Sequence, residues 1–381
     1  MIRKNVFSKL YHCLLVAAVA FAGITPVADA QSSQELRTWG LESLQQIQTD
    51  FSLKQPGLYA DEWKAGSTID RAPAFMWGCG VLLPALVAAA KCDRVEFEPL
   101  LKTNITAIDT YWNTGGSGAP AYDVLPGPKT PDRYYDDNEW VALALVDAYE
   151  LTRDKLLLHR AVDVYNFLVT GEDEKLGGGI YWRENEKTSK NACSNAPAIA
   201  LAARLFQVTH DRKYSTSALR WYKWTNAHLQ DSDGLYWDNI RLDGSVEKTK
   251  WTYNTALMLR SNCLLYSISH EKRFLEEARR IAEAARKRWI YSETGAIADG
   301  GQFAHLLCEA YLALDAIDKD GSWRTVALHA LDFVRHKLRD TNGRYGDRWD
   351  KSIDSPLARV SLLSQASVAR AFLIASVYTK H

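Results

Sequence analysis

The chain has 381 residues, of which 46 are Lys or Arg and 46 are Asp or Glu, so its formal net charge is zero. A nucleic-acid-binding protein normally carries an excess of basic residues on one face, and this balance argues against that class. The 13 Trp and 18 Tyr offer flat rings that can stack on sugars, although such rings also fill contacts between helices.

The chain begins with a segment that is typical of a secretory signal. A basic start precedes an apolar run over residues 14–24, which is too short to cross a bilayer because a transmembrane helix needs ~20 apolar residues. Ala28 and Ala30 then form a small-residue cleavage pattern. We expect residues 1–30 to be removed, residues 31–381 to form one domain without a membrane span, and the mature protein to be secreted or periplasmic.

The cysteines after residue 30 lie along apolar stretches, without the spacing of a metal site. They are Cys79, Cys92, Cys193, Cys263 and Cys308. An odd number leaves at least one of them unpaired within the chain, and most resemble small buried hydrophobic residues. The histidines also lack metal-ligand spacing. We therefore expect no metal, and we do not expect disulfides to hold the fold together.

A polar turn recurs along the chain and divides it into similar units. Its copies lead into Ala161, Ala218, Ala278 and Ala327, and such repetition is typical of stacked supersecondary units. Apolar residues between the turns follow the 3.6-residue period of helices. This pattern predicts twelve helices, over residues 33–52, 76–92, 95–114, 137–152, 155–170, 191–208, 212–228, 252–269, 272–290, 302–317, 322–339 and 357–378. Six helix pairs predict an all-α (α/α)6 barrel, because an open solenoid would need more repeats and polar caps.

The links between these helices alternate in length. Those that follow the even-numbered helices are short, as at residues 153–154 and 270–271. Those that precede the even-numbered helices are long, over residues 115–136, 171–190, 229–251, 291–301 and 340–356. In a barrel this alternation places every long link on one rim, and long loops in a compact domain are usually functional. We expect the site on the rim where the even-numbered, inner helices begin.

Two adjacent acids, Asp136 and Asp137, stand on that rim at the start of the fourth helix. Glycoside hydrolysis uses one carboxylate as nucleophile or base and another as proton donor, ~5–5.5 Å apart in retaining enzymes. The N–H groups of a helix start favour a charged carboxylate, and this charge raises the pKa of its neighbour. Such a pair can also be a plain helix cap, but the rim location favours a catalytic role.

The residues around this pair, 135–140 and 147–150, resemble the signature of glycoside hydrolase family 76, the endo-α-1,6-mannanases. Further stretches fit the same family in its order, over residues 177–182, 190–195 and 252–254. The resemblance implies an (α/α)6 barrel and a retaining mechanism without a cofactor, in which Asp136 is the nucleophile and Asp137 the acid/base. It also implies α-mannan or a manno-oligosaccharide as the substrate, bound by a protein that we expect to be a monomer.

Several residues near the acids on the same rim could contact a sugar. Aromatic side chains could stack on its rings, and polar residues at helix starts could bind its hydroxyls, although burial or helix capping explains them equally well. These candidates are Tyr135, Trp140, Trp182, Lys190, Asn191, Tyr253, Asn254 and Asp299.

Other functions remain open because a fold alone does not name a reaction. An unsaturated-uronide hydrolase would pair one acid with basic residues such as Arg133, Arg183 and Lys190, whereas an epimerase would need paired histidines, of which only His305 is placed suitably. A mannan transglycosylase and a non-catalytic glycan-binding protein could also use this barrel. The adjacent acids favour a glycosidase.

Overall fold

The computed structural model describes residues 32–67, 71–115, 119–127 and 130–379. The predicted signal over residues 1–30 lies outside them, so the secreted or periplasmic location stays a prediction. None of the helices in the described ranges is long and apolar enough to cross a membrane.

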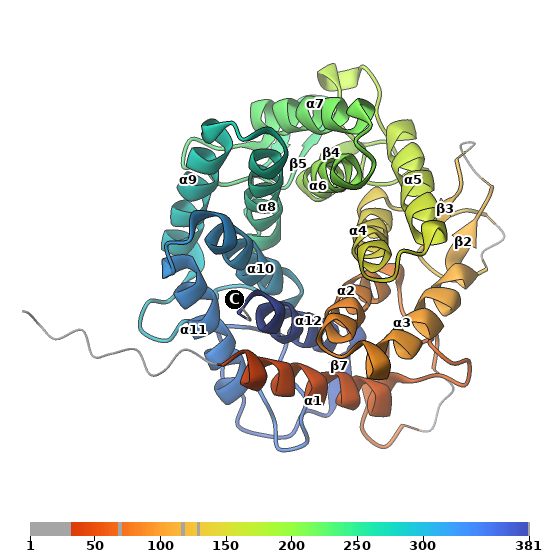
Figure 1. The fold of residues 1–381 in the computed structure, drawn as a ribbon, viewed down its shortest axis with the longest axis vertical. Coiled ribbons are helices and arrows are strands. Elements are labelled where there is room, and N and C mark those ends of the chain that lie inside the picture. The colour runs from red at the N-terminus through yellow and green to blue at the C-terminus, as the bar shows by residue number, and fades with distance from the viewer. Residues whose placement is uncertain (1–31, 68–70, 116–118, 128–129, 380–381) are drawn as a thin grey trace, which may run out of the picture. The chain divides into compact units, whose positions relative to one another are not determined.

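Twelve α-helices in the described part of the chain form two concentric rings (Figure 1). The inner ring contains α2 (Met76–Cys92), α4 (Tyr135–Thr152), α6 (Ala192–Thr209), α8 (Thr252–Ser269), α10 (Gly301–Asp318) and α12 (Leu362–Tyr378). The outer ring contains α1 (Ser33–Phe51), α3 (Arg94–Ile108), α5 (Lys155–Thr170), α7 (Arg212–Leu229), α9 (Lys272–Trp289) and α11 (Ser322–Lys337). Each inner helix packs against the next, and α12 packs against α2 and α1. The predicted (α/α)6 barrel is confirmed.

The two rings differ in how the helices are buried. In α6 every residue from 192 to 203 is buried, because other helices surround an inner helix. The outer helix α9 instead buries one stripe at helical spacing, formed by Phe274, Ala278, Ile281, Ala282, Ala285 and Trp289. A single apolar stripe is typical of a surface helix of a globular protein. The pattern of apolar residues in the sequence therefore distinguishes an outer helix from an inner one.

The recurring polar turn is a left-handed helix end. The residue after each of four inner helices has a φ between 56° and 64°, namely Arg153, His210, His270 and Lys319. Its N–H donates to the carbonyl four residues earlier, which closes the helix. Asp154 and Asp211 then accept hydrogen bonds from the N–H of the second residue of α5 and of α7. These short turns all lie on one end of the barrel.

Replacing Lys319 by Gly is expected to stabilise the fold relative to Lys319→Ala, by about 0.5–1 kcal/mol, because a Cβ is disfavoured at positive φ. Both variants remove the same exposed charge, so their difference in free energy of unfolding isolates the backbone effect. Urea unfolding of the two proteins measures it. Equal stability would contradict a left-handed backbone at this position in solution.

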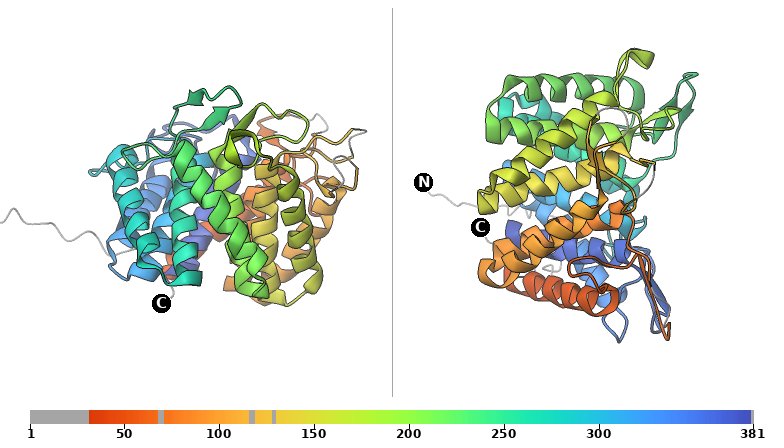
Figure 2. Two further views of the ribbon diagram at one scale, coloured as in Figure 1. Left: turned by 90° about the horizontal axis from the view of Figure 1, so that it is seen from above. Right: turned by 90° about the vertical axis from the view of Figure 1, so that its right-hand side faces the viewer.

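The long links carry short antiparallel strands, and they gather at the end of the barrel opposite these turns (Figure 2). Strand β1 (Glu62–Lys64) pairs with β7 (Arg359–Ser361), which joins the link between α1 and α2 to the link between α11 and α12. The other strands form the pair β2 (Trp112–Asn113) and β3 (Ala121–Tyr122), and the sheet of β4 (Ser189–Asn191), β5 (Asn239–Arg241) and β6 (Val246–Glu247).

Side-chain amides fasten three of these links to the barrel. The N–H of Tyr122 donates to Oδ1 of Asn138 at 2.7 Å, and Nδ2 of Asn138 donates to the carbonyl of Tyr122 at 2.9 Å. The same double bond joins Asn195 to Ile180 and Gln365 to Tyr345. Each amide belongs to the fourth residue of its inner helix. The same helix position therefore attaches a long link to the barrel in three places.

Several predicted helix boundaries differ from the observed ones, and three of the differences bear on the rim. Helix α12 begins at Leu362 instead of residue 357, because residues 359–361 form β7. Helix α3 ends at Ile108 instead of residue 114, because a 3-10 turn and β2 follow it. Helix α4 begins at Tyr135 instead of residue 137, which places Asp136 and Asp137 inside its first turn.

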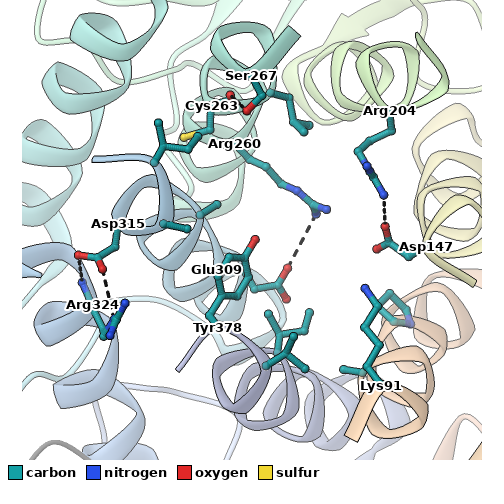
Figure 3. A pocket seen from close by; sticks show the side chains of 18 of the residues that line it. Lys91, Asp147, Arg204, Arg260, Cys263, Ser267, Glu309, Asp315, Arg324 and Tyr378 are labelled. Atoms are coloured by element: carbon teal, nitrogen blue, oxygen red, sulfur yellow. Dashed lines mark hydrogen bonds and ion pairs between the residues drawn. The ribbon is translucent and has the colours of Figure 1, made fainter. Parts of the chain in front are cut away.

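A cavity of about 960 Å³ opens at the short-turn end of the barrel. Charged side chains from different inner helices point into it, including those of Asp147, Arg204, Arg260 and Glu309 (Figure 3). Arg204 binds Asp147 at 2.7 Å. Glu309 accepts two hydrogen bonds from the buried guanidinium of Arg370, at 2.6 and 2.9 Å. The barrel interior therefore contains a buried, bidentate ion pair between Glu309 and Arg370.

Candidate active site

A second cavity, of about 880 Å³, lies on the long-loop rim, where the inner helices begin. All six inner helices contribute to its wall in nearly the same register. The contributors are the second residues of α2, α4, α6, α8 and α12 and the third residue of α10, namely Trp77, Asp136, Cys193, Tyr253, Leu363 and Phe303. The predicted rim therefore holds the cavity that contains both acids.

Asp136 receives several hydrogen bonds. Nε1 of Trp182 donates to its Oδ2 at 3.1 Å, and the N–H of Asp137 donates to its Oδ1 at 3.1 Å. Cys193 lines the same cavity as this carboxylate. Burial raises the pKa of Asp136 to about 6, and the Cys193 thiol and the hydrogen bond from Trp182 limit that rise because donors favour the charged form.

Asp137 has different surroundings on the same turn of α4. Its side chain is 9% exposed and lines the cavity, and no residue in the described ranges donates a hydrogen bond to its carboxyl. Burial and the neighbouring charge of Asp136 raise the pKa of Asp137 well above its usual range. Asp136 therefore ionises first, while Asp137 keeps its proton. Two adjacent carboxyls with separated acidities can serve as a nucleophile and a proton donor.

Aromatic rings line the cavity around the acids. Phe303 stacks on Tyr253 with ring centroids 4.5 Å apart and on Trp77 at 5.8 Å. Trp251 packs against the same ring at 5.3 Å. Trp182, which is 42% exposed, meets Tyr134 edge to face. Exposed aromatic faces beside paired carboxyls suit a ligand with apolar ring faces and polar edges, such as a pyranose.

The structure brings six of the residues predicted for the site to the wall of this cavity. They are Asp136, Asp137, Trp140, Trp182, Asn191 and Tyr253. They come from the helix starts and from the link over residues 171–190, which confirms the inference that the long loops and the inner helix starts meet at one place.

Two other predicted substrate residues instead hold the rim together. Tyr135 is fully buried and stacks on Phe167 with ring centroids 4.6 Å apart. Lys190 is also fully buried, and its ammonium binds Asp173 at 2.7 Å and the carbonyls of Lys175 and Gly178. Neither lines the cavity. Lys190 lies in β4, so its side chain anchors the preceding glycine-rich loop rather than facing a ligand.

Asn254 and Asp299 also lie behind the cavity wall. Nδ2 of Asn254 donates to Asp238 at 3.1 Å, and the asparagine is fully buried. Asp299 accepts hydrogen bonds from the N–H and the hydroxyl of Thr252, at 2.9 and 2.8 Å, so it binds the first residue of α8. Both were predicted to bind substrate, but neither lines the cavity. The carboxylate of Asp299 is taken up by Thr252, whereas Oδ1 of the buried Asn254 has no hydrogen-bond partner among the described residues.

Sequence reasoning missed much of the cavity wall, including Cys193, Phe303 and Asp238. Cys193 was grouped with the inert buried cysteines, although the helix-start register that it shares with Asp136 could have identified it. Phe303 carries no polar group that would have drawn attention. Asp238 follows a turn in a long link and accepts hydrogen bonds from Asn239 and Asn254; burial raises its pKa. Nothing in its local sequence distinguishes it from other loop acids.

Comparison with known proteins places this architecture in a family. The sequence model of glycosyl hydrolase family 76 matches residues 48–351. A mannan endo-1,6-alpha-mannosidase of Candida glabrata is 30% identical over 182 residues, which cover 43% of this chain and 41% of that protein. The structure of a family 76 α-mannanase from Bacteroides thetaiotaomicron has a TM-score of 0.86 and 32% identity, and the match covers 91% of this chain and 96% of that one.

A more distant structure shares the fold. The α-1,6-mannanase of Salegentibacter sp. HEL1_6, solved as an inactive variant in complex with α-1,6-mannotriose, has a TM-score of 0.76 and 21% identity over 90% of this chain and 99% of that one. The chain spans about half the length of two curated relatives that it matches, 55% of one and 41% of the other. The family match nevertheless covers most of the barrel and includes both acids, and the chain belongs to glycosyl hydrolase family 76.

Proposed function

We propose that this protein is a retaining endo-α-1,6-mannanase that hydrolyses the backbone of α-1,6-mannan through a covalent glycosyl-enzyme intermediate. The observation that carries the proposal is the difference between two adjacent carboxyls in one cavity: Asp136 accepts hydrogen bonds and Asp137 does not. The Candida glabrata relative, a mannan endo-1,6-alpha-mannosidase, supports the choice of substrate.

Both acids take part in each of the two steps of the reaction, the formation of the covalent intermediate and its hydrolysis. A carboxylate oxygen of Asp136 attacks the anomeric carbon, while Asp137 gives its proton to the departing glycosidic oxygen, so the glycosidic bond breaks and a mannosyl ester forms. Asp137 then takes a proton from a water molecule, whose oxygen displaces Asp136 from the anomeric carbon. The shortened mannan leaves, and both carboxyls return to their first state.

The residues predicted to serve the rival functions are engaged elsewhere in the protein. A uronide hydrolase needs a free basic residue, yet Arg133 forms a buried bidentate pair with Glu184, and Arg183 binds Asp132 and Glu186. The buried ammonium of Lys190 is also paired. His305, the candidate for epimerase chemistry, is fully buried and does not line the cavity. These pairings favour a neutral sugar substrate.

Product analysis tests the proposal. The mature protein is incubated with unbranched α-1,6-mannan, beside Asp137→Asn. We expect short manno-oligosaccharides from the wild type, with the α configuration at each new reducing end in early NMR spectra. Longer products, formed when acceptor oligosaccharides are added, would instead identify a transglycosylase. Binding of mannan without any turnover would identify a glycan-binding protein, and early products of β configuration would contradict the retaining mechanism.

The pH profile should follow the two carboxyls. The reaction needs Asp136 charged and Asp137 protonated, so kcat/KM should rise as the pH passes about 6, where Asp136 ionises, and fall at higher pH as Asp137 loses its proton. Initial rates on mannan between about pH 4 and about pH 9 measure both limbs. A profile that stays flat through about pH 6 would contradict the role of Asp136.

A further inference from the structure

Cys193 occupies a position in the barrel that corresponds to that of the proposed nucleophile. It is the second residue of α6, as Asp136 is of α4 and Tyr253 of α8. Helix α6 packs against both α4 and α8, so the register sets the thiol between the carboxyl and the phenol. The side chain is 2% exposed and lines the same cavity as both neighbours.

The direction of the hydrogen bonds follows from chemistry. The thiol shares the cavity wall with Asp136 and Tyr253, and it interacts electrostatically with both groups. Burial and the charge of Asp136 hold the pKa of Cys193 well above its usual range, and burial does the same for Tyr253, so each keeps its proton. A charged carboxylate can only accept. A hydrogen bond between the phenol and the thiol therefore runs from the hydroxyl of Tyr253 to Sγ, and one between the thiol and the carboxylate runs from the S–H group to Asp136.

We propose that Cys193 is a positioning residue for Asp136: its thiol, itself fixed by Tyr253, holds the carboxylate in its charged form and in one orientation for attack on the anomeric carbon. This inference rests on the proposed function. It sets Cys193 apart from the other buried cysteines, Cys79, Cys263 and Cys308, which do not line this cavity. Trp182 and the N–H of Asp137 supply the remaining donors.

Three variants test the role of the thiol. Cys193→Ala removes the donor, Cys193→Ser keeps one, and Cys263→Ala is the matched control, since Cys263 is also buried but lies on the wall of the opposite cavity. We expect Cys193→Ala to lower kcat/KM by about tenfold, since a hydrogen bond to a charged group is lost. The acidic limb of its pH profile should move to higher pH, because Asp136 without this donor binds its proton more tightly.

Cys193→Ser should restore both the rate and the pH of the acidic limb, and Cys263→Ala should have the acidic limb of the wild type. A merely structural role for Cys193 would alter stability or rate without moving the acidic limb of the pH profile. If Cys193→Ala and Cys263→Ala share the wild-type limb, the positioning role is wrong. The absence of turnover by the wild type would instead contradict the proposed function.

Infrared spectroscopy tests the contact without any turnover. The difference spectrum between the wild type and Cys193→Ala isolates one S–H stretching band. We expect this band at lower frequency than the band isolated in the same way with Cys263→Ala, because donation to a carboxylate weakens the S–H bond. It should move to higher frequency when Asp136 is protonated below about pH 6. Two bands at the same frequency would overturn the proposed hydrogen bond.

Discussion

Asp136→Asn is expected to abolish hydrolysis of α-1,6-mannan, and Asp137→Asn to lower kcat/KM by about 10²–10⁴-fold, the usual contribution of a general acid. The two losses of activity differ because one carboxyl is the nucleophile and the other is the proton donor. Asparagine at position 136 provides no nucleophile, so no ester forms. Asparagine at position 137 leaves the charged nucleophile in place but removes the proton that the departing oxygen needs.

A substrate with a good leaving group separates the two roles. An aryl glycoside of an α-1,6-manno-oligosaccharide departs without protonation, so Asp137→Asn should form the ester at a nearly normal rate and then stall, because no base activates water. Azide, which needs no base, should release it as an α-mannosyl azide. Asp136→Asn should stay inactive under both conditions.

The control for this pair is Trp182→Phe, which keeps an aromatic ring but removes the Nε1 donor to Oδ2 of Asp136. It should retain activity with an altered pH profile, which shows that the cavity tolerates a change beside the acids. Rescue of Asp136→Asn by the activated substrate, with no rescue of Asp137→Asn, would reverse the two assignments. Full mannanase activity in either variant would refute the mechanism.

The fold was predictable because its signals are local. The apolar period marks each helix within about 15 residues, and the polar turn around His210 contains both the end of α6 and the cap of α7. The start of α12 was not predictable in this way. Residues 359–361 leave the helical conformation to pair with β1 at residues 62–64, and no local pattern reports a partner almost 300 residues away.

The site was predictable only in part, for a similar reason. A rim can be located from loop lengths, and an acid pair can be recognised on it. Whether a polar residue on that rim faces the cavity depends on its register and on its partners. Asn191 and Lys190 are adjacent, yet Asn191 lines the cavity, whereas the ammonium of Lys190 is taken up by Asp173. Four of the ten predicted site residues do not line the cavity, and for two of them, Lys190 and Asp299, a partner distant in the sequence takes up the charged group.

The largest expected effect on stability belongs to the ion pair inside the barrel. Glu309 and Arg370 are 5% and 2% exposed, and one guanidinium nitrogen of Arg370, Nη1, has no hydrogen-bond partner in the described residues. The nearest other cation, Arg260, is 3.9 Å from Glu309. Glu309→Gln would leave the buried charge of Arg370 without a counter-charge, which should reduce the free energy of unfolding by about 3–5 kcal/mol.

The matched control is Glu283→Gln, which breaks the exposed i,i+3 pair with Arg286 on α9 and should cost less than about 1 kcal/mol. The double replacement Glu309→Leu with Arg370→Met removes both charges and should recover most of the loss, because desolvating two ions offsets much of what their attraction contributes. Urea unfolding of the four proteins measures these differences. Equal costs for Glu309→Gln and Glu283→Gln would mean that water reaches Arg370 from the cavity at the short-turn end. A double variant as unstable as the single one would instead locate the loss in packing, since both charges are gone and only the shape of the barrel interior has changed.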